Sequence, residues 1–212
     1  MSGRSAPSVA LVGLVILVVA VLAVVLVGRV QSRPLVVLGG DSITELSAGA
    51  LAGAIDGTLG IGGNDVAVVA RSGATAGEME PEVVAIAAVG PRQVVINLGT
   101  NDAVRTGDLD GAAASIERMA SSFPTAECIH IVTLSESMVA FEDPEGPGGR
   151  AADLNQRIVD LATREGYRLI RWDQIVAESV AGGVPLTLDS IHPDAAGEAR
   201  LADAYRDAVA AC

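Results

Sequence analysis

The amino-acid sequence predicts an α/β domain in which a parallel sheet is covered by helices on both sides. From Pro34 onward, short apolar runs alternate with helical patterns in units of roughly 30 residues, which is typical of strand–helix–strand units. Most of the apolar runs are continuous and rich in β-branched residues, as expected of strands that are buried on both faces. Hydrophobic residues make up 50% of the chain, which is enough for a sizeable core and argues against general disorder.

Five apolar runs are predicted as strands, and the segments between them as helices. The strands cover residues 35–38, 66–70, 94–98, 129–134 and 168–172. The helices cover residues 78–89, 108–122 and 151–165, with a weaker helix over residues 44–56 that contains two glycines. Local signals support these boundaries: Gly90-Pro91 and Gly166 follow helix ends, and Pro193 is a favoured first residue for the last helix.

An apolar run without a charged side chain, residues 9–27, precedes this domain. At about 1.5 Å per residue, a helix of this length nearly spans the roughly 30 Å hydrocarbon core of a bilayer. Two interpretations remain open: an uncleaved transmembrane anchor over residues 9–28 of a single-pass cell-membrane protein, or a secretory signal whose removal releases the protein. We favour the anchor, because a typical signal has only about 7–15 apolar residues and Leu26 is a poor residue three positions before a cut.

The charges beside the apolar run do not decide its orientation. Arg4 precedes the run, and Arg29 and Arg33 follow it, so the count of basic residues is indecisive. Because the run resembles an export signal that was kept, we expect residues 1–8 to form a cytoplasmic stub. Residues 34–212 would then form an extracytoplasmic domain.

The composition argues against a nucleic-acid partner and a structural metal site. The chain has 26 acidic and 14 basic residues, a formal net charge of -12, and this charge repels phosphate backbones. Two His and two Cys are too few for the usual structural zinc site, so no metal site is predicted. In an extracytoplasmic domain Cys128 and Cys212 could form a disulfide, and two unpaired thiols are the open alternative.

Polar residues and glycines follow the predicted strands, at the edge where parallel sheets bind ligands. Ser42 comes after Gly39-Gly40-Asp41, Gly73 follows the second strand, and Asn101 follows the third. Each has an ordinary structural explanation, as a helix N-cap, a turn glycine or a capping side chain. Together they could instead supply a nucleophilic hydroxyl and N–H donors for a developing oxyanion.

An Asp–His pair follows the fifth strand, in the segment from Asp189 to His192. In a tight loop the Asp189 carboxylate can accept a hydrogen bond from the His192 Nδ1–H and leave Nε2 free to take a proton. His130, which alternates with apolar residues in a strand, and Asp102, which lies in a turn, are interpreted as structural. Ser42, an amide donor and this Asp–His pair are the set of groups that acyl transfer requires.

These segments, in this order, resemble the blocks of the SGNH/GDSL hydrolase superfamily. Gly40-Asp41-Ser42-Ile43 is similar to the first block, with Ile where the family name has Leu, and Gly73 falls where the second block has its glycine. The segment from Gly99 to Asp102 matches the GxND block, and the segment from Asp189 to His192 matches the DxxH block. The resemblance covers roughly residues 35–212.

The resemblance implies a flavodoxin-like three-layer α/β/α fold with about five parallel strands, and ester hydrolysis without a metal or organic cofactor. It implies that Ser42 is the nucleophile, His192 the base and Asp189 the group that orients His192. The backbone N–H groups of Ser42 and Gly73 and the Asn101 amide would form the oxyanion hole. The substrate would be a small-molecule, lipid or glycan ester.

Two alternatives share these residues. The first is an acyltransferase in which a hydroxyl of an envelope glycan or lipid replaces water at the acyl-enzyme; comparing transfer to an added alcohol with release of free acid would distinguish it. The second is a catalytically inactive binding domain of the same fold, which should not react with a fluorophosphonate.

Overall fold

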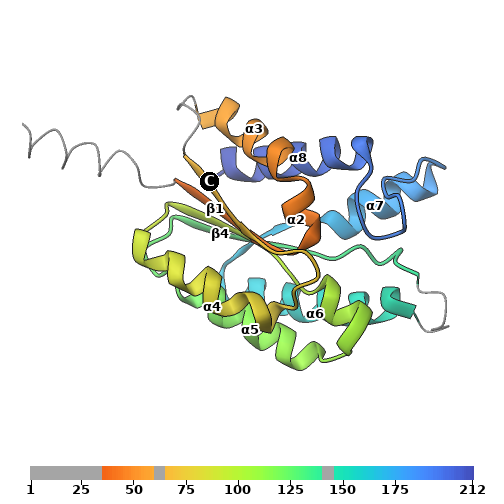
Figure 1. Ribbon diagram of the computed structural model, residues 1–212, viewed down its shortest axis with the longest axis horizontal. Helices are drawn as coiled ribbons and strands as arrows, with labels where there is room; N and C mark the ends of the chain where they lie inside the picture. The colour runs from red at the N-terminus through yellow and green to blue at the C-terminus, as the bar shows by residue number, and fades with distance from the viewer. Residues whose placement is uncertain (1–34, 60–64, 140–145) are drawn as a thin grey trace, which may run out of the picture. The chain divides into compact units, whose positions relative to one another are not determined.

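The computed structural model describes residues 35–59, 65–139 and 146–212, and it shows a five-stranded parallel sheet between two layers of helices (Figure 1). The sheet has the order β2-β1-β3-β4-β5, and every neighbouring pair is parallel. Its strands are β1 (Val36–Gly40), β2 (Val66–Ala70), β3 (Gln93–Asn97), β4 (Cys128–Val132) and β5 (Arg168–Ile170). This is the flavodoxin-like order, in which the direction of winding reverses between β1 and β3. The predicted fold class is therefore confirmed.

The helices divide between the two faces of the sheet (Figure 1). One layer contains α2 (Ser42–Leu46), α3 (Ala48–Leu59), α7 (Trp172–Ala181) and α8 (Ala195–Ala210). The other contains α4 (Ala76–Ile86), α5 (Leu109–Ser121) and α6 (Gly146–Glu165). Two short elements, the 3₁₀ turn η1 (Ala87–Val89) and the π-helical turn η2 (Asp102–Thr106), follow α4 and β3.

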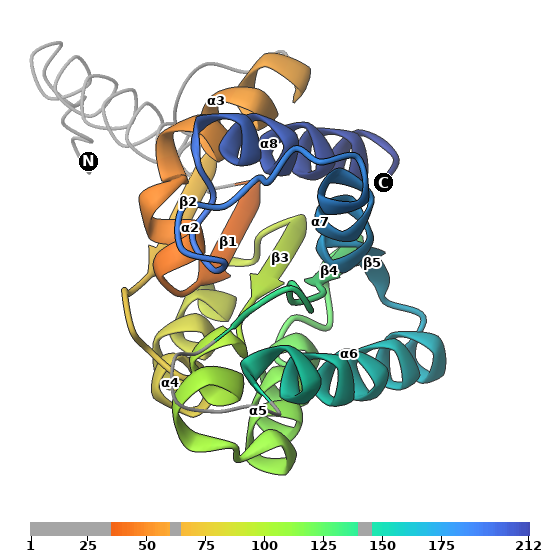
Figure 2. The same cartoon turned by 90° about the vertical axis from the view of Figure 1, so that its right-hand side faces the viewer.

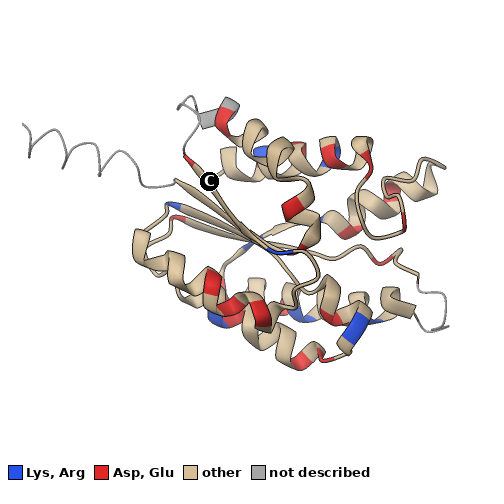
Figure 3. Ribbon diagram, viewed as in Figure 1, with Lys and Arg blue, Asp and Glu red and all other residues tan. Residues whose placement is uncertain are grey.

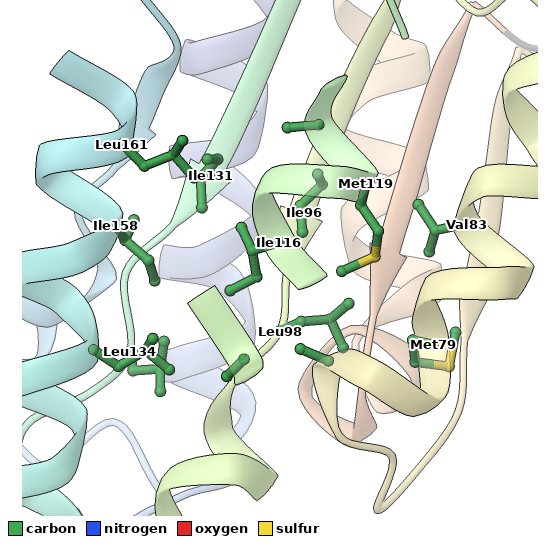
Figure 4. Close-up of a cluster of buried hydrophobic side chains, with 14 of the residues drawn as sticks. Met79, Val83, Ile96, Leu98, Ile116, Met119, Ile131, Leu134, Ile158 and Leu161 are labelled. Carbon is green, nitrogen blue, oxygen red and sulfur yellow. The ribbon is translucent and has the colours of Figure 1, made fainter. Parts of the chain in front are cut away.

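Each face of the sheet has its own apolar core, because successive strand residues point to opposite sides. In β3, Val94 and Ile96 pack against the α4–α6 layer, whereas Val95 packs against the layer that contains α8. Figure 4 shows the first core, in which Met79, Ile116 and other side chains of the helices meet the sheet. The continuous β-branched runs in the sequence therefore reflect burial on both faces.

Several predicted boundaries are wrong. The strand predicted over residues 168–172 ends at Ile170, and Trp172 begins α7 instead, with its ring buried under that helix layer. Pro193 does not begin the last helix: it forms an isolated bridge with Thr187, and Asp194 caps α8 by accepting a hydrogen bond from the Gly197 N–H at 2.8 Å.

The helix predicted over residues 44–56 is two helices, α2 and α3, which are separated at Ser47. The expected membrane-spanning segment, residues 9–27, lies outside the described residues. Within the three described stretches, no helix has both the length and the apolar character needed to cross a bilayer.

A disulfide joins Cys128, the first residue of β4, to Cys212, the last residue of the chain. The two Cα atoms are 6.1 Å apart, and 84 residues of sequence separate them. The link ties the end of the chain that follows α8 to the start of β4, and it restricts the unfolded chain as well as the folded one.

We expect Cys212→Ser to lower the free energy of unfolding by about 2–4 kcal/mol, because the variant's unfolded chain regains the freedom of a long loop. Thermal unfolding with and without dithiothreitol measures this effect. The reductant should lower the midpoint of the wild-type protein to that of the variant and leave the variant unchanged. An equal response of both proteins to the reductant would contradict the prediction.

His130 is fully buried in β4, where its Nε2 lies 3.1 Å from the Gln93 Oε1 atom. Burial, with a smaller contribution from the charge of Arg168, lowers the pKa of His130 to about 4. The ring is therefore neutral in the folded protein near neutral pH, which agrees with the structural interpretation from the sequence.

This lowered pKa predicts a loss of stability in mild acid. Between about pH 6.5 and pH 4, His130 is protonated in the unfolded chain but neutral in the folded protein. The free energy of unfolding therefore falls by up to about 1.4 kcal/mol for each pH unit in that window. Urea unfolding at several pH values should show a shallower pH dependence for His130→Gln than for the wild type. Parallel slopes for the two proteins would show that His130 does not contribute.

Candidate active site

Ser42 lies at a sharp turn from β1 into α2. Asp41, which precedes it, accepts a hydrogen bond from the Ile43 N–H at 3.0 Å and caps the helix. Gly40 is required for this turn, because a Cβ at that position would lie only 2.0 Å from the Thr44 Oγ1 atom. The turn therefore places Ser42 at the carboxyl edge of the sheet, beside the point where the strand order reverses.

The loop before α8 brings His192 to Ser42, although 150 residues separate them in sequence. The Ser42 Oγ and the His192 Nε2 are 2.9 Å apart, and the His192 Nδ1 is 2.7 Å from the Asp189 Oδ2. In Figure 2, where this edge of the sheet faces the viewer, the loop passes beside α2. The three side chains thus form a continuous hydroxyl–imidazole–carboxylate chain.

The Asp–His loop is fixed by bonds to its own backbone. The second carboxylate oxygen of Asp189 accepts hydrogen bonds from the N–H groups of Ile191 (3.0 Å) and His192 (2.7 Å). The Leu188 N–H donates to the His192 carbonyl at 2.9 Å and closes the turn. Ser190 occupies the left-handed region with φ of 70°, and its hydroxyl accepts from the Val139 N–H at 3.1 Å.

The contacts of Asp189 also determine its charge. Partial burial raises its pKa, but the hydrogen bonds from the His192 ring, from the His192 N–H and from the Ile191 N–H outweigh that effect and lower the pKa to about 2. Asp189 is therefore a carboxylate at every pH at which the protein can be expected to work. It can stabilise a positively charged His192 without taking the proton itself.

Three candidate N–H donors belong to separate segments, which follow β1, β2 and β3. Within the described part of the chain, the backbone N–H groups of Ser42 and Gly73 have no hydrogen-bond partner. The Asn101 Nδ2 donates to the Ala74 carbonyl at 3.0 Å, which orients the amide and uses one of its two N–H bonds. Among the described residues, no second hydrogen bond of the Asn101 amide nitrogen is present.

The two residues that were interpreted as structural each have a hydrogen-bond partner outside the Ser42–His192–Asp189 chain. The Asp102 Oδ2 accepts from the Ala76 N–H at 2.9 Å, and His130 lies within the sheet. Sequence reasoning missed the contribution of Asp41: burial raises its pKa to about 7, while the hydrogen bond from the Ile43 N–H lowers it in part. Its place beside Ser42 in the motif was the available signal.

No group of three or more His, Cys, Asp or Glu side chains within residues 35–59, 65–139 and 146–212 is arranged to hold a metal ion.

Residues 39–200 match the family model of the GDSL-like lipase/acylhydrolase family. The chain belongs to this family. The resemblance noted in the sequence is thereby confirmed, and the protein is an SGNH-type esterase or acylhydrolase. No curated protein matches the chain.

Solved structures of GDSL and related hydrolases share the fold. An acetylxylan esterase from Geobacillus stearothermophilus is 19% identical with a TM-score of 0.68, and the match covers 82% of this chain and 93% of that one. A lipase/acylhydrolase from Enterococcus faecalis is 21% identical with a TM-score of 0.68, with 83% and 95% covered. A GDSL-like lipase from Bacteroides thetaiotaomicron is 21% identical with a TM-score of 0.65, with 84% and 88% covered.

Gly73 has a φ of 76°, so a side chain there is strained whatever the space around it. We expect Gly73→Ala to lower kcat at least about tenfold, because relief of the strain would turn the Gly73 N–H away from the oxyanion position. Gly53→Ala is the control, since nothing lies within 4 Å of a Cβ at that helical position. Full activity in Gly73→Ala would exclude Gly73 as a donor.

Proposed function

We propose that the protein cleaves carboxylic esters through a covalent acyl-enzyme formed on Ser42. The observation that carries this proposal is the 2.9 Å contact between the Ser42 Oγ and the His192 Nε2, with Asp189 on the far side of the ring. In this geometry His192 can remove the hydroxyl proton as the oxygen attacks the ester carbonyl. Asp189 then stabilises the imidazolium that forms.

The tetrahedral intermediate places negative charge on the former carbonyl oxygen. The N–H groups of Ser42, Gly73 and Asn101 are the donors that would stabilise this charge. His192 returns its proton to the leaving alcohol as the acyl-enzyme forms. A water molecule, deprotonated by His192, then attacks the acyl-enzyme and releases the acid and free Ser42.

The charge of the domain favours an uncharged or cationic ester over an anionic one. All 26 acidic residues follow Pro34, whereas three of the 14 arginines precede it, so the domain is more acidic than the whole chain. Figure 3 shows Asp and Glu positions in the helices on both sides of the sheet. A field of this sign disfavours the approach of polyanionic substrates. The similar structures include an acetylxylan esterase and lipases, so acylated glycans and lipid esters are the first substrates to test.

We further propose that residues 9–28 anchor the domain outside the cytoplasm, supported by the uncharged apolar run and by the Cys128–Cys212 disulfide, which an oxidising compartment favours. Cell fractionation of the full chain tests the anchor. The protein should stay with membranes after alkaline carbonate extraction. Recovery of a chain cleaved near residue 28 from the medium would show secretion instead.

We expect a fluorophosphonate to label the wild-type protein at Ser42, as mapped by mass spectrometry. Ser42→Ala should lose labelling and at least about 10⁴-fold in kcat on p-nitrophenyl acetate, because the nucleophile is gone. Asn101→Ala should remain labelled and lose about 10²–10³ in kcat, as expected for one oxyanion donor. Ser121→Ala, at an exposed hydroxyl on α5, is the control. Unlabelled wild-type protein would indicate an inactive binding domain, and activity retained by Ser42→Ala would refute the assignment.

A further inference from the structure

The loop that carries Gly73 is held by side chains from two other elements. It connects β2 to α4 and covers residues 71–75. Apart from the turn bond from the Ala74 N–H to the Arg71 carbonyl, the contacts that bracket Gly73 come from α2 on one side and from the segment that follows β3 on the other. These are the same two segments that carry Ser42 and Asn101.

On the α2 side, Glu45 forms hydrogen bonds with Ser72, the residue before Gly73. The Glu45 Oε2 accepts a hydrogen bond from the Ser72 N–H at 2.7 Å and a second, short one from the Ser72 hydroxyl. These two bonds lower the pKa of Glu45, which stays ionised and remains a strong acceptor. Because Glu45 is three residues after Ser42 on α2, it links the nucleophile's helix to the glycine loop.

On the other side, the segment that contains η2 forms hydrogen bonds with Gly73 and the residues after it. The Arg105 Nη1 donates to the Gly73 carbonyl at 2.5 Å, and Asn101, the residue before η2, donates to the Ala74 carbonyl. The Asp102 carboxylate accepts from the Ala76 N–H. The bonds come from one short stretch of chain, which includes a π-helical turn, an irregularity often found at functional sites.

We propose that Glu45 and Arg105 are positioning residues that aim the Gly73 N–H at the oxyanion. This inference rests on the proposed esterase function. The direction of that N–H is set by the peptide unit between Ser72 and Gly73. Glu45 fixes the peptide unit before it through the Ser72 N–H, and Arg105 fixes the one after it through the Gly73 carbonyl. A glycine at φ of 76° has wide conformational freedom, so an N–H with no partner of its own needs such external restraint.

A positioning role and a purely stabilising role of Glu45 and Arg105 predict effects of different size on stability and on rate. Both contacts are exposed, and exposed charged contacts contribute little to folding. A displacement of about 1 Å at a reacting centre, however, can cost about a hundredfold in rate. Loss of either side chain should therefore leave the thermal midpoint almost unchanged and lower the rate of the chemical step.

The test compares Arg105→Met and Glu45→Ala with the wild-type full chain on p-nitrophenyl acetate. We expect each variant to lose at least about tenfold in kcat with KM within about twofold. The inhibition constant of a boronic acid, which forms a tetrahedral adduct on the serine, should rise by a similar factor. Glu45→Gln and Arg105→Lys should recover part of the loss, because each keeps one suitable acceptor or donor.

Arg71→Met is the matched control. Arg71 lies in the same loop, and this substitution removes a positive charge just as Arg105→Met does. The Arg71 guanidinium, however, binds Glu82 and the Glu78 carbonyl rather than the peptide units around Gly73. An equal loss in Arg71→Met, a change confined to KM, or unchanged kinetics in Arg105→Met and Glu45→Ala would each overturn the inference. Wild-type labelling that depends on Ser42 would still support the esterase function in those cases, so the two failures are distinguishable.

Discussion

The hydrogen bond between the Ser42 hydroxyl and the His192 ring is the contact on which the proposed chemistry depends. It joins two segments whose residues are 150 positions apart in the sequence. The sheet supplies the common frame: Ser42 leaves the end of β1, and His192 is delivered by a loop whose turn is closed by Asp189 and by the Thr187–Pro193 bridge. The geometry of the pair is therefore a property of the whole domain.

Asp41, the residue before Ser42, is a buried carboxyl group that the fold must accommodate beside the site. Asp41 is completely buried, and burial raises its pKa to about 7, so the folded protein tolerates a carboxyl group in an unfavourable environment. Its Oδ1 accepts a hydrogen bond from the Ile43 N–H and caps α2, whereas its Oδ2 has no hydrogen-bond partner within the described residues. The helix that carries Ser42 is therefore capped by a buried carboxyl group whose second oxygen lacks a partner, which is a costly arrangement.

Sequence reasoning reached the fold because burial on both faces leaves a strong pattern in strands such as β3. It singled out Ser42, Asp189 and His192, which the structure joins by hydrogen bonds, because each lies in a short sequence motif. It failed where tertiary contacts decide the outcome: Trp172 has a strand-like neighbourhood in sequence, but its buried ring begins a helix. Glu45 and Arg105 were invisible for a related reason, since their partners are backbone groups of a distant loop and impose no pattern on neighbouring residues.

The amino and carboxyl ends of the parallel strands, called here the two edges of the sheet, are stabilised in different ways. Cys128 is the first residue of β4, so the disulfide lies at the amino edge and opposite the edge that carries Ser42. A covalent link at that edge can stabilise the domain without restricting the loops that must admit a substrate. At the carboxyl edge, by contrast, the loops are held by several side-chain hydrogen bonds to backbone groups, and each exposed one contributes little to folding. Substitutions of exposed side chains at this edge should therefore change the rate of the reaction with little effect on folding. Loss of the disulfide at the amino edge should lower the stability of the fold with little effect on the rate.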